Sequence, residues 1–223
     1  MNYEQLNNNI VSLSGEIIDE PKYSHEMFNE GFYEFNLKVM RLSDAFDVIP
    51  VTVSERLLGE YNLKKGDMMS GKGQFRSFNK MEDDKSRLRL TMFIREIAPY
   101  DPNVNPNQID IVGYVCKEPI FRTTPFKREI CDVLLAVNRN YNKSDYLPCI
   151  AWGRNARFMK GLAVGDKIQA SGRIQSREYE KKLENGEVEK RVAYEVSLAK
   201  VANISELYDG INNYQKHENY MAR

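Results

Sequence analysis

The stretch YLPCIAWGRNARF, residues 146–158, holds the only tryptophan of the 223-residue chain. Its first half is mainly apolar, and its second half contains two arginines. Side chains of a β-strand alternate between the two faces of a sheet. One parity of the first half is small and apolar, as a barrel interior requires: Leu147, Cys149 and Ala151. Tyr146 and Trp152 are then expected on the outer face, and the following GRNARFMKGL has the length and composition of one short helix. The stretch predicts a half-buried strand that leads directly into a helix.

The chain contains an internal repeat, and this stretch belongs to its second copy. At an offset of 98 residues the copies share these positions: Gly15 and Gly113, Pro21 and Pro119, Phe28 and Phe126, Arg41 and Arg139, Pro50 and Pro148. At an offset of 99 they share Gly66 and Gly165, Gly73 and Gly172, Ser77 and Ser176. The offset reaches 104 where Leu88 matches Val192, because the second copy has a longer hairpin loop, EYEKKLENGEVEKR. We therefore expect two copies of one domain.

Each copy is expected to form five strands, with one helix between the third and the fourth. In the second copy the alternating apolar pattern places the strands near 108–117, 130–139, 145–152, 166–178 and 191–203. This element order is that of the OB-fold, a small and partly open barrel. The predicted fold class is all-β with two tandem OB-folds. The expected organisation is OB-fold 1 at 1–98, a proline-rich linker at 99–106, OB-fold 2 at 107–204 and a tail at 205–223 that could be helical.

The formal net charge of zero is a sum over two unlike halves. Residues 1–106 carry 13 basic against 17 acidic side chains, whereas residues 107–204 carry 17 against 12. This asymmetry makes the second copy the better partner for an anionic ligand.

Several classes of function find no support in the composition. Only two distant histidines, His25 and His217, and three cysteines without a CxxC pair are present, so no metal and no disulfide framework are expected. Phosphate-cradling and nucleophile motifs are absent, so neither a cofactor nor catalysis is expected. No apolar run approaches the roughly 18 residues of a membrane helix, and the first residues lack a secretory signal. The expectation is a soluble, cytoplasmic protein that is not an enzyme.

The fourth strand of the second copy divides apolar from basic residues. One parity is Ile168, Ala170, Gly172 and Ile174, and the other is Lys167, Gln169, Ser171, Arg173, Gln175, Arg177 and Tyr179. Aromatic rings stack on bases at about 1–3 kcal/mol per base, and Lys and Arg neutralise phosphates. Together with Tyr146 and Trp152, this strand predicts an open face that binds a single strand of nucleic acid.

At this point the second copy resembles the bacterial single-stranded-DNA-binding protein family, in its tandem OB-fold form. The resemblance rests on four segments: NQIDIVGYVCKEP, LLAVNRNY, YLPCIAWGRNARF and VGDKIQASGRIQSREY. In that family four aromatic positions stack on bases, and by alignment they fall on Tyr141, Tyr146, Trp152 and Tyr179. The basic residues expected beside them are Arg139, Arg154, Lys167, Arg173 and Arg177.

The first copy departs from this pattern, since the matched positions are Ser43, Val48, Ser54 and Lys80. A weaker, secondary binding set is expected there: Phe46, Lys72, Arg76, Phe78 and Lys80. The family's acidic C-terminal tip, which recruits other replication and repair proteins, has no match in the closing HENYMAR. Recruitment of replication proteins by that route is therefore not expected.

The expected function is binding of single-stranded DNA with little sequence preference, in replication, recombination or repair, mainly through OB-fold 2. The resemblance also implies a homodimer that contains four barrels. Two alternatives stay open. The first is a protein-interaction adaptor, a primosome-like or mobile-element accessory factor whose barrels pair with protein. The second is binding of single-stranded RNA, because stacking on rings does not distinguish the 2′-hydroxyl.

Overall fold

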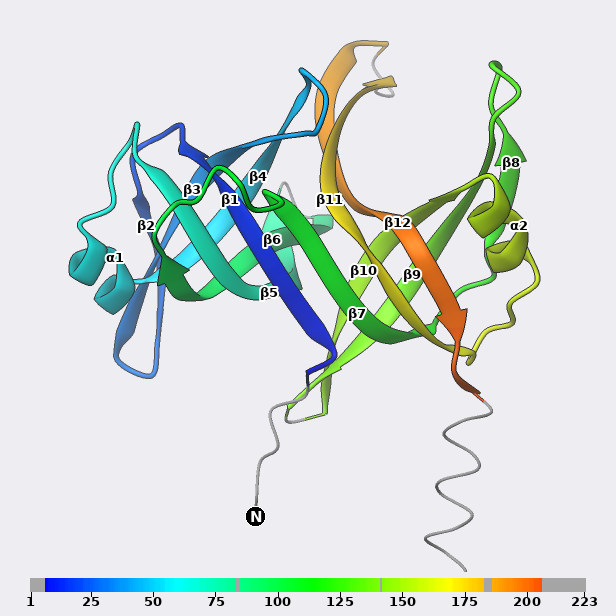
Figure 1. The fold of residues 1–223 in the computed structure, drawn as a ribbon, viewed down its shortest axis with the longest axis horizontal. Helices are drawn as coiled ribbons and strands as arrows, with labels where there is room; N and C mark the ends of the chain where they lie inside the picture. Colours follow the sequence, from blue (N-terminus) through cyan, green and yellow to red (C-terminus); the bar gives the residue numbers. More distant parts are fainter. Residues whose placement is uncertain (1–6, 83–84, 141, 183–185, 206–223) are drawn as a thin grey trace, which may run out of the picture.

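The computed structural model describes residues 7–82, 85–140, 142–182 and 186–205, which form two strand barrels with one short helix each. The first barrel consists of β1 (Asn9–Ile17), β2 (Lys22–Met27), β3 (Glu30–Met40), β4 (Phe46–Ser54), α1 (Glu55–Tyr61), β5 (Met68–Glu82) and β6 (Lys85–Ala98). The second consists of β7 (Asn107–Val115), β8 (Ile120–Thr123), β9 (Glu129–Arg139), β10 (Lys143–Trp152), α2 (Arg154–Lys160), β11 (Lys167–Lys182) and β12 (Val188–Asn203). Figure 1 shows the barrels side by side, with α1 and α2 at the two outer ends. The predicted tandem OB-folds are confirmed.

Two details differ from the sequence prediction. A sixth strand, β2 or β8, pairs with the edge of β3 or β9 in each barrel. These short strands are almost entirely exposed, so they carry no alternating apolar signal. The predicted loop EYEKKLENGEVEKR is largely paired strand, because β11 and β12 stay in register as far as Lys182 and Val188.

Each barrel closes by the same set of pairings. β1 pairs with β5 along most of its length and with β3 at its end, while β4 and β6 close the barrel in parallel. The second barrel repeats the parallel closure with β10 and β12. Where β1 crosses β3, a side chain at Gly15 would collide with the backbone carbonyl of Lys38. Only glycine permits this close approach of two strands.

The predicted faces of the third strand are confirmed for the inner residues and for both rings, whereas Ile150, which shares the parity of the rings, is buried. Leu147, Cys149 and Ala151 are buried in the core, whereas Tyr146 and Trp152 are 47% and 39% exposed. Pro148 does not interrupt β10, because the register with β9 continues through it. The alternation in the sequence therefore gives the correct face for both aromatic rings.

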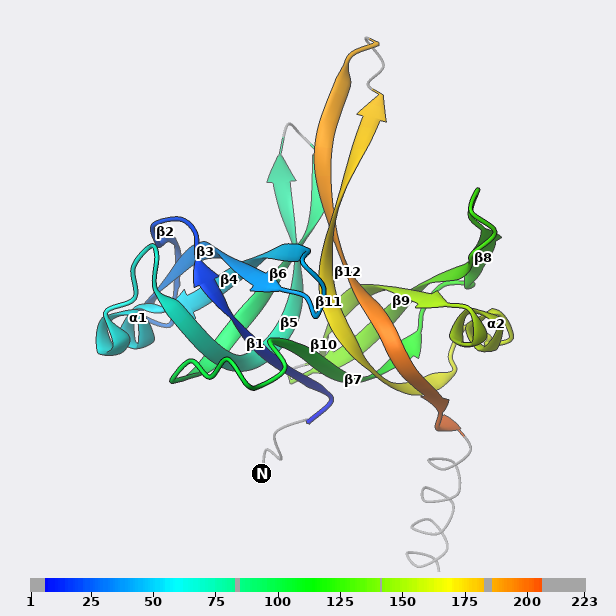
Figure 2. The ribbon, with the colours of Figure 1, turned by 45° about the horizontal axis from the view of Figure 1, so that its top comes forward.

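The two barrels are joined by backbone pairing between β1 and β7, which are the first strands of the two copies. They run antiparallel from Asn9 opposite Ile111 to Leu13 opposite Asn107, and this pairing makes one continuous sheet across the molecule. β1 and β7 lie next to each other in both views of the ribbon (Figures 1 and 2). Residues 99–106, between the barrels in sequence, form neither strand nor helix.

Two matched polar contacts also cross between the barrels. The buried carboxylate of Asp47 accepts a hydrogen bond from the backbone N–H of Ser176 at 2.8 Å. In the opposite sense, the buried carboxylate of Asp145 accepts one from the backbone N–H of Ser77 at 2.7 Å. Each serine hydroxyl accepts a bond from the residue that follows the aspartate, at 3.1 and 2.7 Å. We call the β1–β7 pairing and these two contacts the junction.

Within the described part of the chain, neither helix is long and apolar enough to cross a membrane. The predicted tail lies outside the described residues beyond Ser205.

Candidate nucleic-acid interface

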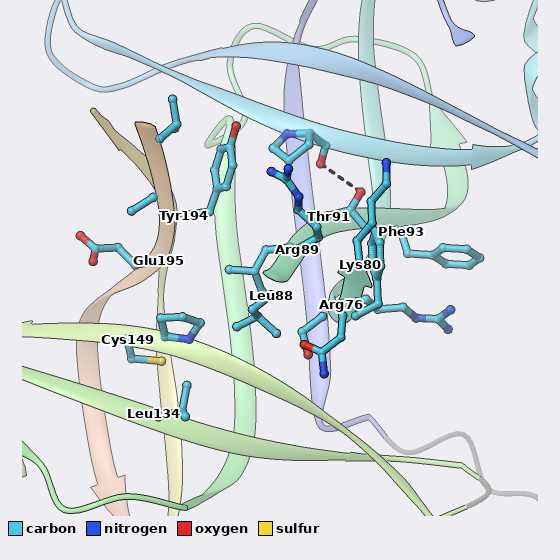
Figure 3. A pocket seen from close by; sticks show the side chains of 18 of the residues that line it. Arg76, Lys80, Leu88, Arg89, Thr91, Phe93, Leu134, Cys149, Tyr194 and Glu195 are labelled. Carbon is cyan, nitrogen blue, oxygen red and sulfur yellow. Dashed lines mark hydrogen bonds between the residues drawn. The ribbon is translucent and has the colours of Figure 1, made fainter. Parts of the chain in front are cut away.

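A cleft of about 1080 Å³, here called the inter-barrel cleft, is lined by residues of both barrels. The first barrel contributes mainly the β5–β6 hairpin, and the second contributes β9, β10 and the β11–β12 hairpin. Figure 2 shows these two hairpins rising next to each other between the barrels. In Figure 3, Arg76, Lys80 and Arg89 of the first barrel lie on one side of the cleft, with Tyr194 and Glu195 of the second opposite.

The inter-barrel cleft brings together six of the residues predicted from the sequence. Three belong to the main set, Arg139, Arg177 and Tyr179, and three to the secondary set, Arg76, Phe78 and Lys80. The main and the secondary set, which come from different copies, thus contribute residues to one cleft. Tyr179 and Phe78 each keep about 40% of their surface in solvent, at 38% and 43%, so both rings are open to a base.

Trp152 lies outside this cleft, in a smaller hollow of about 470 Å³ between the start of α2 and the β8–β9 turn. Its cationic neighbours there are Lys127, Arg128 and Arg157. Gly153, which also lines the hollow, has a φ of 53°, a conformation that favours glycine. Gly153 is also the extra residue of the second copy, because α1 begins directly after β4.

Other predicted residues of the second barrel are spread around it. Tyr146 is exposed beside the junction, where its backbone N–H donates to Ser77 Oγ. Arg154 is exposed at the first position of α2, and the amino group of Lys167 lies 5.5 Å from the ring centroid of Tyr114. Tyr141 lies outside the described residues.

The middle of β11 is not an open row of cations. Arg173 donates to Asp47 of the other barrel at 3.2 Å and to Gln175 at 3.0 Å. Gln175 was expected to face outward but is buried, and it donates to Glu195 at 2.7 Å. The physical reason is that the first barrel packs against this part of β11, which a single-copy reading of the strand does not anticipate.

The secondary set of the first barrel is divided in the same way. Phe46 is half exposed, with the amino group of Lys38 at 4.9 Å from its ring centroid, and Lys72 is exposed. Neither lines the inter-barrel cleft. Arg76 does, with its guanidinium 3.9 Å from the ring centroid of Phe93.

Sequence reasoning missed several side chains that line the cleft, among them Arg89, Phe93 and Tyr194. Burial raises the pKa of Tyr194, and the nearby positive charge of Arg89 opposes that rise. The repeat could have indicated them, because they lie on matched strands. Arg89 and Phe93 are on β6, and Tyr194 is on β12, which are the second strands of the two hairpins. Across the described ranges, no group of three His, Cys, Asp or Glu side chains could hold a metal ion.

Comparison with known proteins gives matches of two kinds. The model of the single-strand binding protein family matches residues 106–204, which are the second barrel. Single-stranded DNA-binding protein 2 of Listeria innocua is 32% identical over 125 residues, which cover 51% of this chain and 76% of that protein. Single-stranded DNA-binding protein B of Bacillus subtilis is 36% identical over 85 residues, which cover 33% of this chain and 72% of that protein. The chain belongs to the single-strand binding protein family.

Solved structures extend the likeness to both barrels. The wild-type single-stranded DNA binding protein from Thermus aquaticus matches with a TM-score of 0.70 and 19% identity, over 87% of this chain and 92% of that chain. At this identity the match establishes the fold, a pair of OB-folds in one chain.

Proposed function

We propose that this protein binds single-stranded DNA with little sequence preference, in replication, recombination or repair, and that the second barrel supplies most of the binding. The observation that carries the proposal is the exposure of three large rings, Tyr146, Trp152 and Tyr179, on the outside of a basic barrel. Their positions are those at which the resemblance implies base stacking. Tyr141 completes the set in the sequence.

Physical chemistry supports this assignment over a purely structural role for the rings. A ring that serves packing alone gains by full burial, whereas these three keep between 38% and 47% of their surface in solvent. Arg139, Arg154, Lys167 and Arg177 add positive charge to the same barrel, and phosphate neutralisation supplies affinity without reading sequence. Arg173 remains in the proposed set, although its guanidinium also bonds Asp47.

Trp152, as the sole tryptophan, provides a direct test. Oligo-dT of about 35 nucleotides, long enough for several OB-fold sites, is titrated into the protein while tryptophan fluorescence is followed at low and moderate salt. We expect saturable quenching that weakens as salt rises, and none with duplex DNA of the same length. Oligo-rU in parallel measures any preference between DNA and RNA.

A flat fluorescence signal, together with no complex in a gel-shift assay, would overturn the proposal. The protein-interaction adaptor would then become the leading alternative, to be examined by affinity capture with known replication proteins. Tighter binding of oligo-rU than of oligo-dT would instead assign the site to RNA.

We also propose a homodimer with four barrels, on the basis of the family resemblance alone. Sedimentation equilibrium measures it directly. A molar mass near twice the 25.9 kDa of the chain supports the dimer, and a mass that stays at 25.9 kDa at micromolar concentration overturns it.

A further inference from the structure

The two aspartates of the junction differ in how fully arginines satisfy them. Asp47 receives two bonds from Arg41, at 2.8 and 2.6 Å, and one from Arg173 at 3.2 Å. Arg139 approaches Asp145 no closer than 3.5 Å, and its buried Nε has no hydrogen-bond partner among the described residues. The carboxylate of Asp47 therefore has more arginine hydrogen bonds than that of Asp145. Arg139, beside Asp145, keeps one donor, its Nε, without a partner among the described residues.

A second arginine lies close to this pair. Arg76 directly precedes Ser77, whose backbone N–H bonds Asp145. The pKa of Arg76 is lowered to about 10, chiefly by burial and also by the positive charges of Arg95 and Arg139, while Asp145 opposes the shift. Two arginines, Arg139 and Arg76, therefore act on the single carboxylate of Asp145, and Arg95 adds a third positive charge near Arg76, so the excess is positive.

The acidic residues that line the inter-barrel cleft do not cancel this excess, because there are four of them, Glu34, Glu118, Asp132 and Glu195, against six Lys and Arg side chains. Glu34 accepts from Ser24 at 2.7 Å, Asp132 pairs with Arg122 at 2.8 Å, and Glu195 accepts from Gln175 at 2.7 Å. Among the described residues, the hydrogen bonds of Arg76 go to a neutral acceptor, the side-chain oxygen of Gln74. An anion that entered the cleft would meet arginine donors whose charge is not locally balanced.

Phosphate is the anion whose geometry suits a pair of guanidinium groups. The cleft also presents one exposed ring from each barrel, Phe78 and Tyr179, on which bases could stack. We propose, on the basis of the proposed function, that a backbone phosphate of the bound strand sits between Arg76 and Arg139. One strand then crosses the inter-barrel cleft and contacts both barrels.

The contacts at Asp47 indicate at which end of the junction the phosphate binds. Arg41 and Arg173 already bond the carboxylate there, so they offer fewer donors to a second anion. The proposed phosphate site therefore lies at the Asp145 end of the junction. The first barrel, which lacks the stacking set, contributes through Arg76 and Phe78.

The test compares two variants of the first barrel that remove the same charge. Arg76→Gln alters the cleft, whereas Arg56→Gln alters an exposed residue of α1 that does not line it. Binding of fluorescein-labelled dT35 is followed by anisotropy over a series of salt concentrations. For Arg76→Gln we expect roughly tenfold weaker binding and a salt slope smaller by about 0.7, the value for one phosphate of a single strand. Arg56→Gln should match the wild type in both.

The outcomes separate this inference from the proposed function. If the wild type binds dT35 and Arg76→Gln keeps both its affinity and its salt slope, the strand does not use this site, although the protein still binds DNA. If the wild type does not bind, the proposed function fails and the inference fails with it. Should Arg76→Gln unfold, Asp145→Asn decides, because it removes the competing charge and keeps an acceptor for Ser77. Severalfold tighter binding supports the phosphate site, and unchanged or weaker binding overturns it.

Discussion

The two barrels share one fold, but only some of their matched positions hold the same residue. Polar groups that serve the junction are the same in both copies, as with Asp47 and Asp145, or Ser77 and Ser176. On the outer face the copies diverge, with Val48 against Tyr146, for example. The aspartates and serines that hold the barrels together are repeated, whereas the exposed stacking rings are not. The comparison separates structural positions from binding positions within one sequence.

The largest effect is expected from breaking the better-bonded end of the junction. Asp47→Asn leaves Arg41 and Arg173 facing an amide, so the free energy of unfolding should fall by about 3 kcal/mol, the low end for a broken buried pair because both arginines are partly exposed. Asp145→Asn should cost less than about 1 kcal/mol, because burial already raises the pKa of that carboxyl and the arginine contact is long. Urea unfolding measures both, with the exposed Asp44→Asn as control. Equal losses at the two aspartates would remove the proposed difference.

The next largest effect concerns binding through the ring that only the second barrel has. Trp152→Ala should weaken binding of labelled dT35 by about 2 kcal/mol, the loss of one stacked base. Ser54→Ala at the matched position should leave binding unchanged. Ser54 caps α1 through a bond from the N–H of Leu57, so its loss lowers stability instead. Anisotropy reads both variants, and a larger binding loss for Ser54→Ala would contradict the site assignment.

A matched pair of glycines should respond alike in both barrels. β5 and β11 each have a register shift, at Gly73 and Gly172, where a side chain would collide with the carbonyl of Phe93 or Ser197. Alanine at either glycine should lower the free energy of unfolding by roughly 1–2 kcal/mol through overpacking. Gly161→Ala, where only ordinary contacts exist, is the control. A loss in one barrel alone would show that the two bulges are not equivalent.

The smallest effect is expected from adding a stacking ring to the first barrel, at the position matched to Tyr146. Val48 and Tyr146 occupy the same backbone environment, since each N–H donates to a serine hydroxyl of the other barrel. Val48→Tyr should therefore tighten binding of dT35 by about 1 kcal/mol, the lower end for a stacked base. Val104→Tyr, an exposed position in the segment between the barrels, provides a control for the added ring. Unchanged affinity for Val48→Tyr would place this face of the first barrel away from the strand.

Much of the fold was predictable because local alternation records which face of a strand meets the core. The face of Trp152, the two helices and the repeat all followed from such patterns. The inter-barrel cleft did not, because it depends on contacts between residues more than 60 positions apart. One signal was available: Asp145 shares the core-facing parity of Leu147 and Cys149. An acid on the inner parity of both copies indicates a buried partner, and here the partner is the other barrel.

The pairing of β1 with β7 has a consequence for behaviour on dilution. In an assembly of separate chains, such a contact is a bimolecular equilibrium and is lost below its dissociation constant. Here the eight-residue segment 99–106 joins the two barrels in one chain, so the local concentration of β1 and β7 is on the order of millimolar at any bulk concentration. Recognition that requires both barrels should therefore persist at subnanomolar protein.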